Sequence, residues 1–186
     1  VWFENPRPSG DPFVGSEWTR HEVGTIGSWG KDVYLSDFDN NGLMDIATRN
    51  SSTAMIFFQT AVNTWSRMDL TGVNTGTEGM SSGDVDSDTH VDLILRGQWV
   101  RNPGGAAART AVNWTAYDIG PANTDFKALV ADINGDGHND VLFSSSENTD
   151  DVNWWSADGN DATGTWTKHT IVANLERCHT MQAADM

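Results

Sequence analysis

Short acidic segments recur along the chain, and their residue types could bind a metal ion. The first segment begins at Asp37 and places oxygen-bearing side chains at alternate positions, with Gly42 sixth and an aspartate ninth. Alternating carboxylate and amide oxygens, a backbone carbonyl from the seventh residue and a glycine for the tight turn suit the flexible oxygen shell of Ca²⁺. Mg²⁺ fits less well, because it retains its waters and requires a small octahedron.

Three copies of this segment align without gaps, and a fourth begins at Asp185. Their leading aspartates follow one another at intervals of roughly 50 residues, a period typical of four-stranded propeller blades. We call residues 37–45, 84–92 and 132–140 the first, second and third acidic loops. The predicted metal ligands, including the seventh residue for its carbonyl, are Asp37, Asp39, Asn41, Leu43, Asp45, Asp84, Asp86, Asp88, His90, Asp92, Asp132, Asn134, Asp136, His138, Asp140 and Asp185.

The surroundings of these loops distinguish them from EF-hands. An EF-hand loop needs a helix on each side and a glutamate at its twelfth position, whereas these loops run directly into strand-like segments such as Ile46–Thr48. The second loop has Thr89 where the other two have glycine. We therefore expect a strained turn and a lower cation affinity in that loop.

We predict that each repeat contains four strands, which position its acidic loop. One strand precedes the loop, a second follows it, a third is aromatic, and a fourth opens with a tryptophan that we expect to pack between neighbouring sheets. The sequence thus predicts an all-β fold, a β-propeller with three complete and two partial blades, as part of a seven- or eight-bladed ring with about one Ca²⁺ per complete blade. The alternative is a four-bladed ring in which the N-terminal strands pair with the C-terminal strand and one blade stays incomplete. Within a single propeller region, 1–186, we expect the last two strands of one blade in 1–24, blades in 30–72, 77–120 and 125–172, and the start of another in 178–186.

Composition narrows the classes of partner. The net charge of −15 disfavours nucleic acid and anionic membranes, and no apolar stretch is long enough for membrane insertion. The single cysteine, Cys178, excludes an internal disulfide framework, so bound metal could take over that stabilising role. Asn50 and Asn113 begin N-x-S/T triplets and are candidate glycosylation sites.

With three loops in register and a shared strand pattern, the chain resembles the FG-GAP and VCBS class of calcium-binding β-propeller repeats over essentially its whole length. The resemblance implies calcium ions that stabilise each blade, and an extracellular protein, either secreted or at the cell surface. The Phe-Gly and Gly-Ala-Pro boxes of the integrin-type members are missing, so the resemblance does not extend to integrin ligand-binding heads.

A second group of residues is predicted to lie at the end of each blade opposite the acidic loop. These residues differ from blade to blade, as expected if several blades each contribute one group to a shared ligand. Their cations could hold carboxylates or sulfates, and an unrepeated tryptophan could stack on a sugar; the alternative is that they are ordinary solvated charges. The predicted ligand-binding residues are Trp29, Lys31, Asp32, Arg49, Glu78, Arg96, Lys127 and His179.

The sequence is compatible with three functions. The first is a recognition or scaffold module whose partner is a glycan or, second, an extracellular protein. The alternative is a polysaccharide lyase or sugar dehydratase, an activity of some calcium propellers that the chain resembles, with His179 or Lys127 as base and Arg49 or Arg96 stabilising an enolate. The third is an assembly or filament protein in which blades of the same chain or of neighbouring chains complete each other's sheets.

Overall fold

The computed structural model describes residues 1–76, 78–120, 125–157 and 164–184. Their regular structure consists of antiparallel strands and short 3₁₀ helices, which confirms the predicted all-β class. The predicted ligand Asp185 lies outside the described residues.

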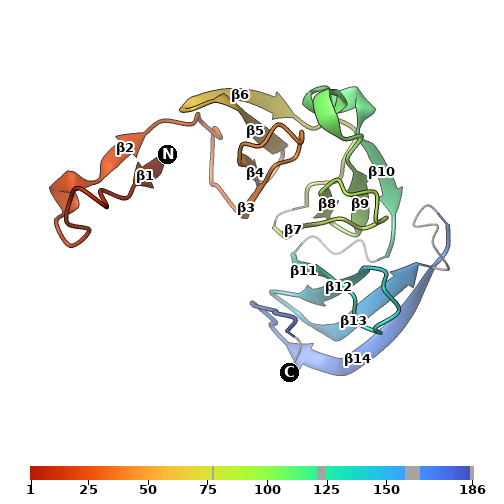
Figure 1. The fold of residues 1–186 in the computed structure, drawn as a ribbon. Helices are drawn as coiled ribbons and strands as arrows, with labels where there is room; N and C mark the ends of the chain where they lie inside the picture. The colour runs from red at the N-terminus through yellow and green to blue at the C-terminus, as the bar shows by residue number, and fades with distance from the viewer. Residues whose placement is uncertain (77, 121–124, 158–163, 185–186) are drawn as a thin grey trace.

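Four sheets follow one another along the chain, and within each sheet the strands lie in sequence order (Figure 1). The N-terminal sheet pairs β1 (Trp2–Glu4) with β2 (Thr19–His21). The first four-stranded sheet contains β3 (Val33–Ser36), β4 (Asp45–Arg49), β5 (Ala54–Ala61) and β6 (Thr64–Asp69). The second contains β7 (Met80–Gly83), β8 (Asp92–Leu95), β9 (Gln98–Arg101) and β10 (Thr115–Asp118). The third contains β11 (Phe126–Ala131), β12 (Asp140–Ser145), β13 (Thr149–Ala157) and β14 (Trp166–Glu176). The 3₁₀ helices are η1 (Gly15–Glu17), η2 (Gly105–Arg109) and η3 (Ala111–Asn113).

Each acidic loop joins the first two strands of a four-stranded sheet in the same register. The residue before each loop pairs with the ninth loop residue: Ser36 with Asp45 in the first sheet, and likewise Gly83 with Asp92 and Ala131 with Asp140. The loop is therefore a closed connection between paired antiparallel strands, as the sequence pattern predicts. Side chains alternate between the two faces of a strand. With this common register, corresponding residues of the three sheets therefore lie on the same face of their sheet.

The sheets stand in an open arc, and the described residues do not close into a ring (Figure 1). We predicted that a further blade starts in 178–186, with its first strand at Thr180–Ala183; that strand is absent, because residues 177–184 have no regular secondary structure. A strand needs a paired neighbour, and among the described residues this segment has only single contacts, such as the bond from Cys178 N–H to the Ser145 carbonyl (3.0 Å).

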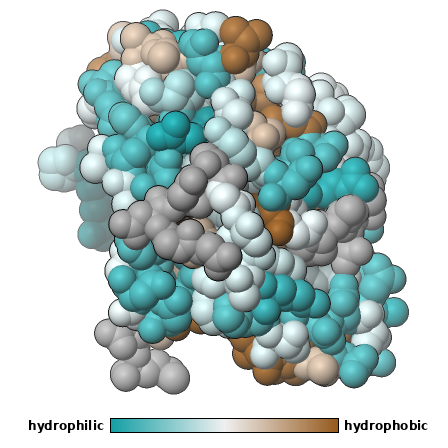
Figure 2. Space-filling model, turned by 90° about the vertical axis from the view of Figure 1, so that its right-hand side faces the viewer, coloured by the Kyte–Doolittle hydropathy of each residue, from teal (hydrophilic) through white to brown (hydrophobic). Residues whose placement is uncertain are grey.

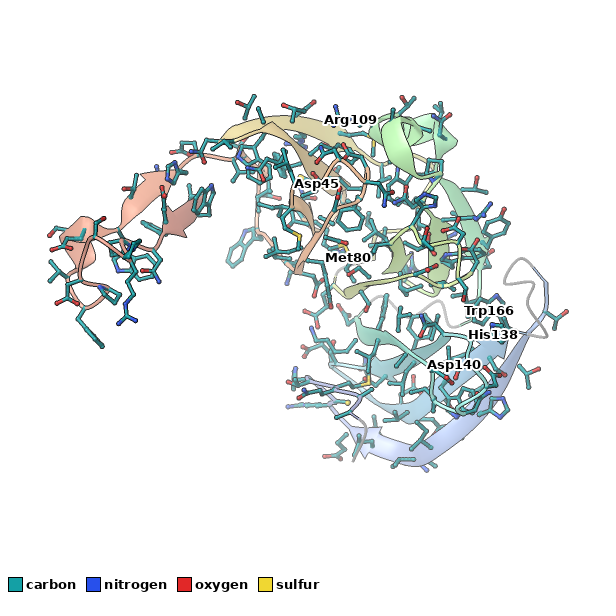
Figure 3. The ribbon with its side chains drawn as sticks, in the orientation of Figure 1. Asp45, Met80, Arg109, His138, Asp140 and Trp166 are labelled. Carbon is teal, nitrogen blue, oxygen red and sulfur yellow. The ribbon has the colours of Figure 1, made fainter. Side chains whose placement is uncertain are left out.

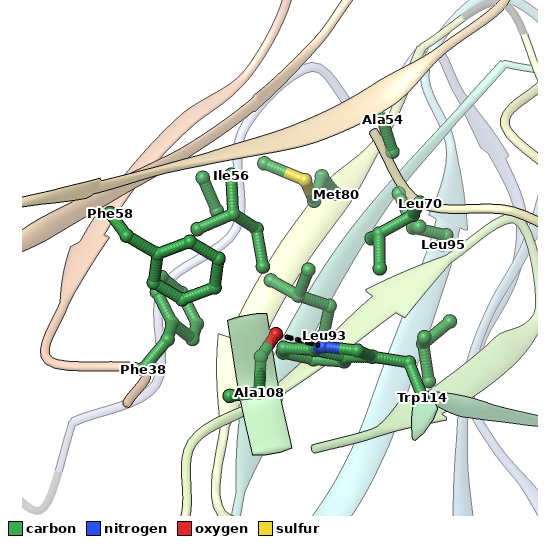
Figure 4. Packing of buried hydrophobic residues seen from close by; sticks show 12 residues of the cluster. Phe38, Ala54, Ile56, Phe58, Leu70, Met80, Leu93, Leu95, Ala108 and Trp114 are labelled. Carbon is green, nitrogen blue, oxygen red and sulfur yellow. Dashed lines mark hydrogen bonds between the residues drawn. The ribbon is translucent and has the colours of Figure 1, made fainter. Parts of the chain in front are cut away.

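Two hydrophobic clusters join the sheets face to face. Between the first and second sheets, Phe38, Ile56 and Phe58 pack with Met80 and residues of β8 (Figure 4). Between the second and third sheets, the cluster includes Val85, Ile94, Trp99, Phe126, Phe143 and Trp155. Full burial of each large apolar side chain contributes roughly 1.5–3 kcal/mol, so these clusters hold the sheets in the arrangement that positions the loops.

The tryptophans that open the fourth strands differ in burial. Trp114 belongs to the first cluster and donates its indole N–H to the Ala108 carbonyl at 2.7 Å (Figure 4). Trp166 packs against the second cluster, and Trp18 and Trp65 are half-buried. A core role is therefore confirmed most clearly for Trp114.

The face in Figure 2 is mainly hydrophilic, with scattered hydrophobic groups. Among the described residues, no helix has the length and apolar character needed to cross a bilayer.

Candidate metal centre

The three acidic loops share one set of internal hydrogen bonds. In the first loop, the Asp37 carboxylate accepts from the backbone N–H groups of Asn41 (3.0 Å) and Gly42 (2.7 Å), and the Asn41 side chain accepts from Leu43 N–H (2.7 Å). The ninth residue, Asp45, accepts from Phe38 N–H at 2.9 Å. The equivalent bonds occur in the second and third loops. The sequence repeat is thus a repeat of local geometry.

The sixth position of each loop has a left-handed backbone, which explains the glycine there. Gly42 and Gly137 both have φ of 87°. Thr89 is forced into the same region with φ of 74°, where a β-branched side chain is strained. The strain that we predicted for the second loop is therefore present.

The first loop brings three carboxylates together. Asp37, Asp39 and Asp45 each offer an oxygen, and these oxygens lie within 4.8 Å of one another. Asp39 is only 4% exposed, and its Oδ1 atom has no hydrogen-bond partner. A buried carboxylate oxygen without a partner is costly, so this atom is suited to a cation.

Asp45, the ninth residue of the first loop, is the member of this cluster labelled in Figure 3. It is fully buried, and burial raises its pKa to about 6, although Gln59 and Phe38 N–H groups donate to it and oppose the shift. The neighbouring charges of Asp39 and Asp37 raise it further. Carboxylates crowded in this way repel one another, and a divalent cation would relieve the repulsion.

The second loop forms a similar cluster from Asp84, Asp86 and Asp88. Its ninth residue, Asp92, is fully buried, and burial raises its pKa to about 7 despite the N–H groups of Asn102 and Val85 that donate to it. Arg101 from β9 also reaches into this cluster: its Nε lies 2.6 Å from Asp86 Oδ2 and its Nη2 lies 3.0 Å from Asp88 Oδ2.

The third loop is more open. Asp132, Asn134 and Asp136 are exposed, and the Asn134 amide donates to Asp136 at 2.9 Å. Among the described residues, the carboxylates that converge closely are those of the first two loops. The first loop is less open than the third because residues of the sheet after it pack over it.

Side chains of one sheet bind the loop of the sheet before it. Asn102, which directly follows β9, is fully buried and donates to the carbonyls of Phe38 in the first loop (2.8 Å) and Val91 in the second (3.0 Å). Arg109 of η2 contacts Asp39 Oδ2 of the first loop at 2.5 Å (Figure 3). Asn139 of the third loop donates to the Asp84 carbonyl of the second at 2.7 Å. The acidic loops are therefore part of the junctions between sheets.

Sequence reasoning missed Arg101, Asn102 and Arg109. The sequence did contain a signal for Arg101. The repeat aligns Arg101 with Phe58 in the first sheet and Ser156 in the third, so only the second sheet has a cation at this position. Asn102 and Arg109 act across sheets, which a repeat alignment within one sheet does not show.

Some of the predicted ligand-binding residues, Lys31, Asp32, Glu78 and Lys127, lie together at the strand ends opposite the acidic loops. Glu78 lies 3.9 Å from Lys31, which precedes β3, and 3.4 Å from Lys127 of β11, and it also contacts the Ser146 hydroxyl. Burial opposes ionisation of Glu78, but Ser146 and the two lysines hold its pKa below the usual range. Asp32 accepts from Gly79 N–H at 3.0 Å. In this geometry, Glu78 joins all three four-stranded sheets.

Arg49 has no exposed surface. Its guanidinium donates to the carbonyls of Gly79 (3.0 Å), Gly76 (2.6 Å) and Asn50, which join the first sheet to the chain entering the second. Burial lowers its pKa. These contacts give Arg49 a structural role that sequence reasoning did not assign.

The other three predicted ligand-binding residues, Trp29, Arg96 and His179, have different surroundings. Trp29 is 84% exposed, Arg96 is half-buried in a left-handed conformation, and His179 lies 3.9 Å from Glu147. A cavity of about 1080 Å³ between the third sheet and residues 178–184 is lined mainly by apolar groups such as Leu129, Leu142 and Met181, and by none of the four candidate catalytic residues.

The two candidate glycosylation sites also differ. Asn113 is exposed. Asn50 is 7% exposed, and its amide donates to the Ile26 carbonyl at 2.7 Å, a bond that a glycan on that nitrogen would have to break.

No family model matches the chain, and neither a curated protein nor a solved structure is significantly similar to it.

Proposed function

We propose that the protein is a calcium-stabilised β-sheet scaffold, in which an ion at the first acidic loop fixes the junction between the first two four-stranded sheets. The observation that carries this proposal is the partnerless Oδ1 atom of Asp39, which is buried beside the oxygens of Asp37 and Asp45. Arg109 occupies only the other oxygen of Asp39, so Oδ1 remains available to an ion.

The donor set supports calcium as the ion. Asp37, Asp39 and Asp45 supply carboxylate oxygens, and Asn41 and the Leu43 carbonyl would extend the shell with neutral oxygens. Hard oxygen donors without thiolate or imidazole favour Ca²⁺ over Zn²⁺ or Cu²⁺. When bound, the ion would supply two positive charges to a loop that also binds Arg109 of η2 and Asn102, the residue after β9. It would thereby stabilise the packing between sheets.

The wider proposal is that the three four-stranded sheets are propeller blades of the FG-GAP and VCBS kind in an extracellular protein. The repeated loop geometry and the face-to-face packing of the sheets support it. Extracellular calcium modules bind their ions at roughly 10⁻⁴–10⁻³ M, and a loop-borne site of this kind is compatible with that range.

Thermal unfolding with and without calcium tests the scaffold proposal. At calcium concentrations 100-fold above the dissociation constant, binding stabilises a protein by about 2.7 kcal/mol, which for a chain of this size is roughly 5–10 °C in Tm. We expect this rise in wild type and its loss in Asp39→Asn, which keeps the shape of the side chain and removes its charge. Asp69→Asn is the matched control, because Asp69 pairs with Arg67 on β6, away from the loops. The proposal fails if wild type and Asp39→Asn respond to calcium equally.

Glycan binding is a second proposal, favoured by the 84% exposure of Trp29 close in sequence to Lys31. An exposed indole provides a stacking surface for a sugar ring, and Lys31 could contact an acidic substituent. Affinity electrophoresis through gels that contain acidic polysaccharides should show retardation of wild type and normal migration of Trp29→Ala. Equal migration of the two proteins in every gel would rule out this site.

A further inference from the structure

The second acidic loop differs from the other two in both its turn and its charge environment. Its sixth residue is Thr89 rather than glycine, with a strained φ of 74°. It also faces an arginine, Arg101, at a position that strand pairing aligns with Phe58 in the first sheet and Ser156 in the third. Two independent departures from the repeat thus fall on the same loop.

Arg101 occupies the place between two of the loop's carboxylates. Its Nε lies 2.6 Å from Asp86 Oδ2, and its Nη2 lies 3.0 Å from Asp88 Oδ2. A guanidinium that bridges two carboxylates neutralises part of the same charge that would attract a metal ion. In the first loop, by contrast, Arg109 contacts only one carboxylate, through one oxygen.

The bridge is placed so that it can open. The Arg101 side chain is 42% exposed, while those of Asp86 and Asp88 are 12% and 25% exposed. The guanidinium can therefore turn into solvent while the carboxylates stay in the loop. Asp86 Oδ1 is buried without a hydrogen-bond partner, so the loop keeps an oxygen that Arg101 does not satisfy.

We propose that Arg101 is a built-in competitor for the cation at the second acidic loop, where a divalent ion binds only by displacing its guanidinium. The first loop is then the tighter calcium site, and the second fills at higher calcium concentration with release of Arg101. This inference rests on the proposed calcium binding at the first loop.

Backbone amides give a separate signal for each loop. The N–H groups of Gly42 and Thr89 donate to the leading aspartate of their own loop, at 2.7 and 2.9 Å. A calcium titration followed by two-dimensional amide NMR should therefore report each loop's midpoint independently. In wild type, we expect the Gly42 signal to reach its midpoint at a lower calcium concentration than the Thr89 signal.

Arg101→Gln tests the competitor directly. We expect the Thr89 midpoint to fall roughly tenfold, the equivalent of about 1.4 kcal/mol, while the Gly42 midpoint stays unchanged. Arg20→Gln is the control for net charge, because Arg20 forms an exposed pair with Glu22 on the N-terminal side of the molecule, and it should move neither midpoint.

The outcomes separate the two proposals. If Gly42 titrates but the Thr89 midpoint is unchanged in Arg101→Gln, or already equals that of Gly42 in wild type, the competitor role is refuted and calcium binding at the first loop stands. If no loop amide responds to calcium in any folded variant, the proposed calcium function and this inference both fail.

Discussion

Arg49→Met is expected to weaken the junction between the first two four-stranded sheets strongly. Arg49 is fully buried, and its guanidinium donates to the carbonyls of Gly79, Gly76 and Asn50. Methionine keeps much of the side-chain volume but leaves these three acceptors without their charged donor. Each buried acceptor that loses its partner costs about 1–3 kcal/mol, and removal of a desolvated charge offsets part of that sum. We therefore expect a net loss of about 3 kcal/mol in the free energy of unfolding.

Urea unfolding followed by tryptophan fluorescence, in calcium-saturated buffer, measures this loss. Arg20→Met is the matched control: Arg20 and Glu22 are 52% and 69% exposed, and such pairs contribute at most about 1 kcal/mol. If the free energy of unfolding of Arg49→Met lies within about 0.5 kcal/mol of wild type, the hydrogen bonds of Arg49 do not hold the sheets together. Arg49 would then have no structural role at this junction.

Three further predictions concern the acidic loops. Thr89→Gly should raise the free energy of unfolding by roughly 1 kcal/mol in urea melts, because it relieves a left-handed β-branched residue; an unchanged or lower value would contradict the strain. Asn102→Ala should lower it by about 3 kcal/mol, since the buried amide bonds to the Phe38 and Val91 carbonyls are lost; a loss below about 1 kcal/mol would show that those carbonyls find other partners. The pKa of Asp92 rises from 3.8 to about 7 on folding, so its contribution to stability is present below pH 3.8 and is lost as the pH rises to about 7. In calcium-free buffer, Asp92→Asn should therefore show a smaller fall in stability between pH 4 and 7 than wild type, and equal slopes would contradict the raised pKa.

Much of the fold could be predicted because its signals are local and repeated. The loop spacing, the strand after each loop and the glycines at Gly42 and Gly137 all follow from the needs of one tight connection between paired strands. Thr89 was recognised as a strained exception for the same reason, since a left-handed position can be inferred from its neighbours in the repeat.

The remaining part of the site depends on contacts between sheets. Nothing in the pattern around Arg49 indicates that its guanidinium is buried among backbone carbonyls, and charged residues at strand ends are usually solvated. Arg109 reaches the first loop from η2, a segment with no counterpart in the alignment of strands. Glu78 was expected to face a ligand, whereas it lies between Lys31, just before β3, and Lys127 of β11. Such pairings depend on how the sheets pack, which no single repeat specifies.

The most direct test of the calcium site is a crystal structure of the calcium-saturated protein with anomalous data collected at a long wavelength. We expect a calcium peak at the first acidic loop, about 2.3–2.6 Å from Asp39 Oδ1, with Asp37 and Asp45 beside it. A saturated crystal with no anomalous peak at Asp39 would contradict it.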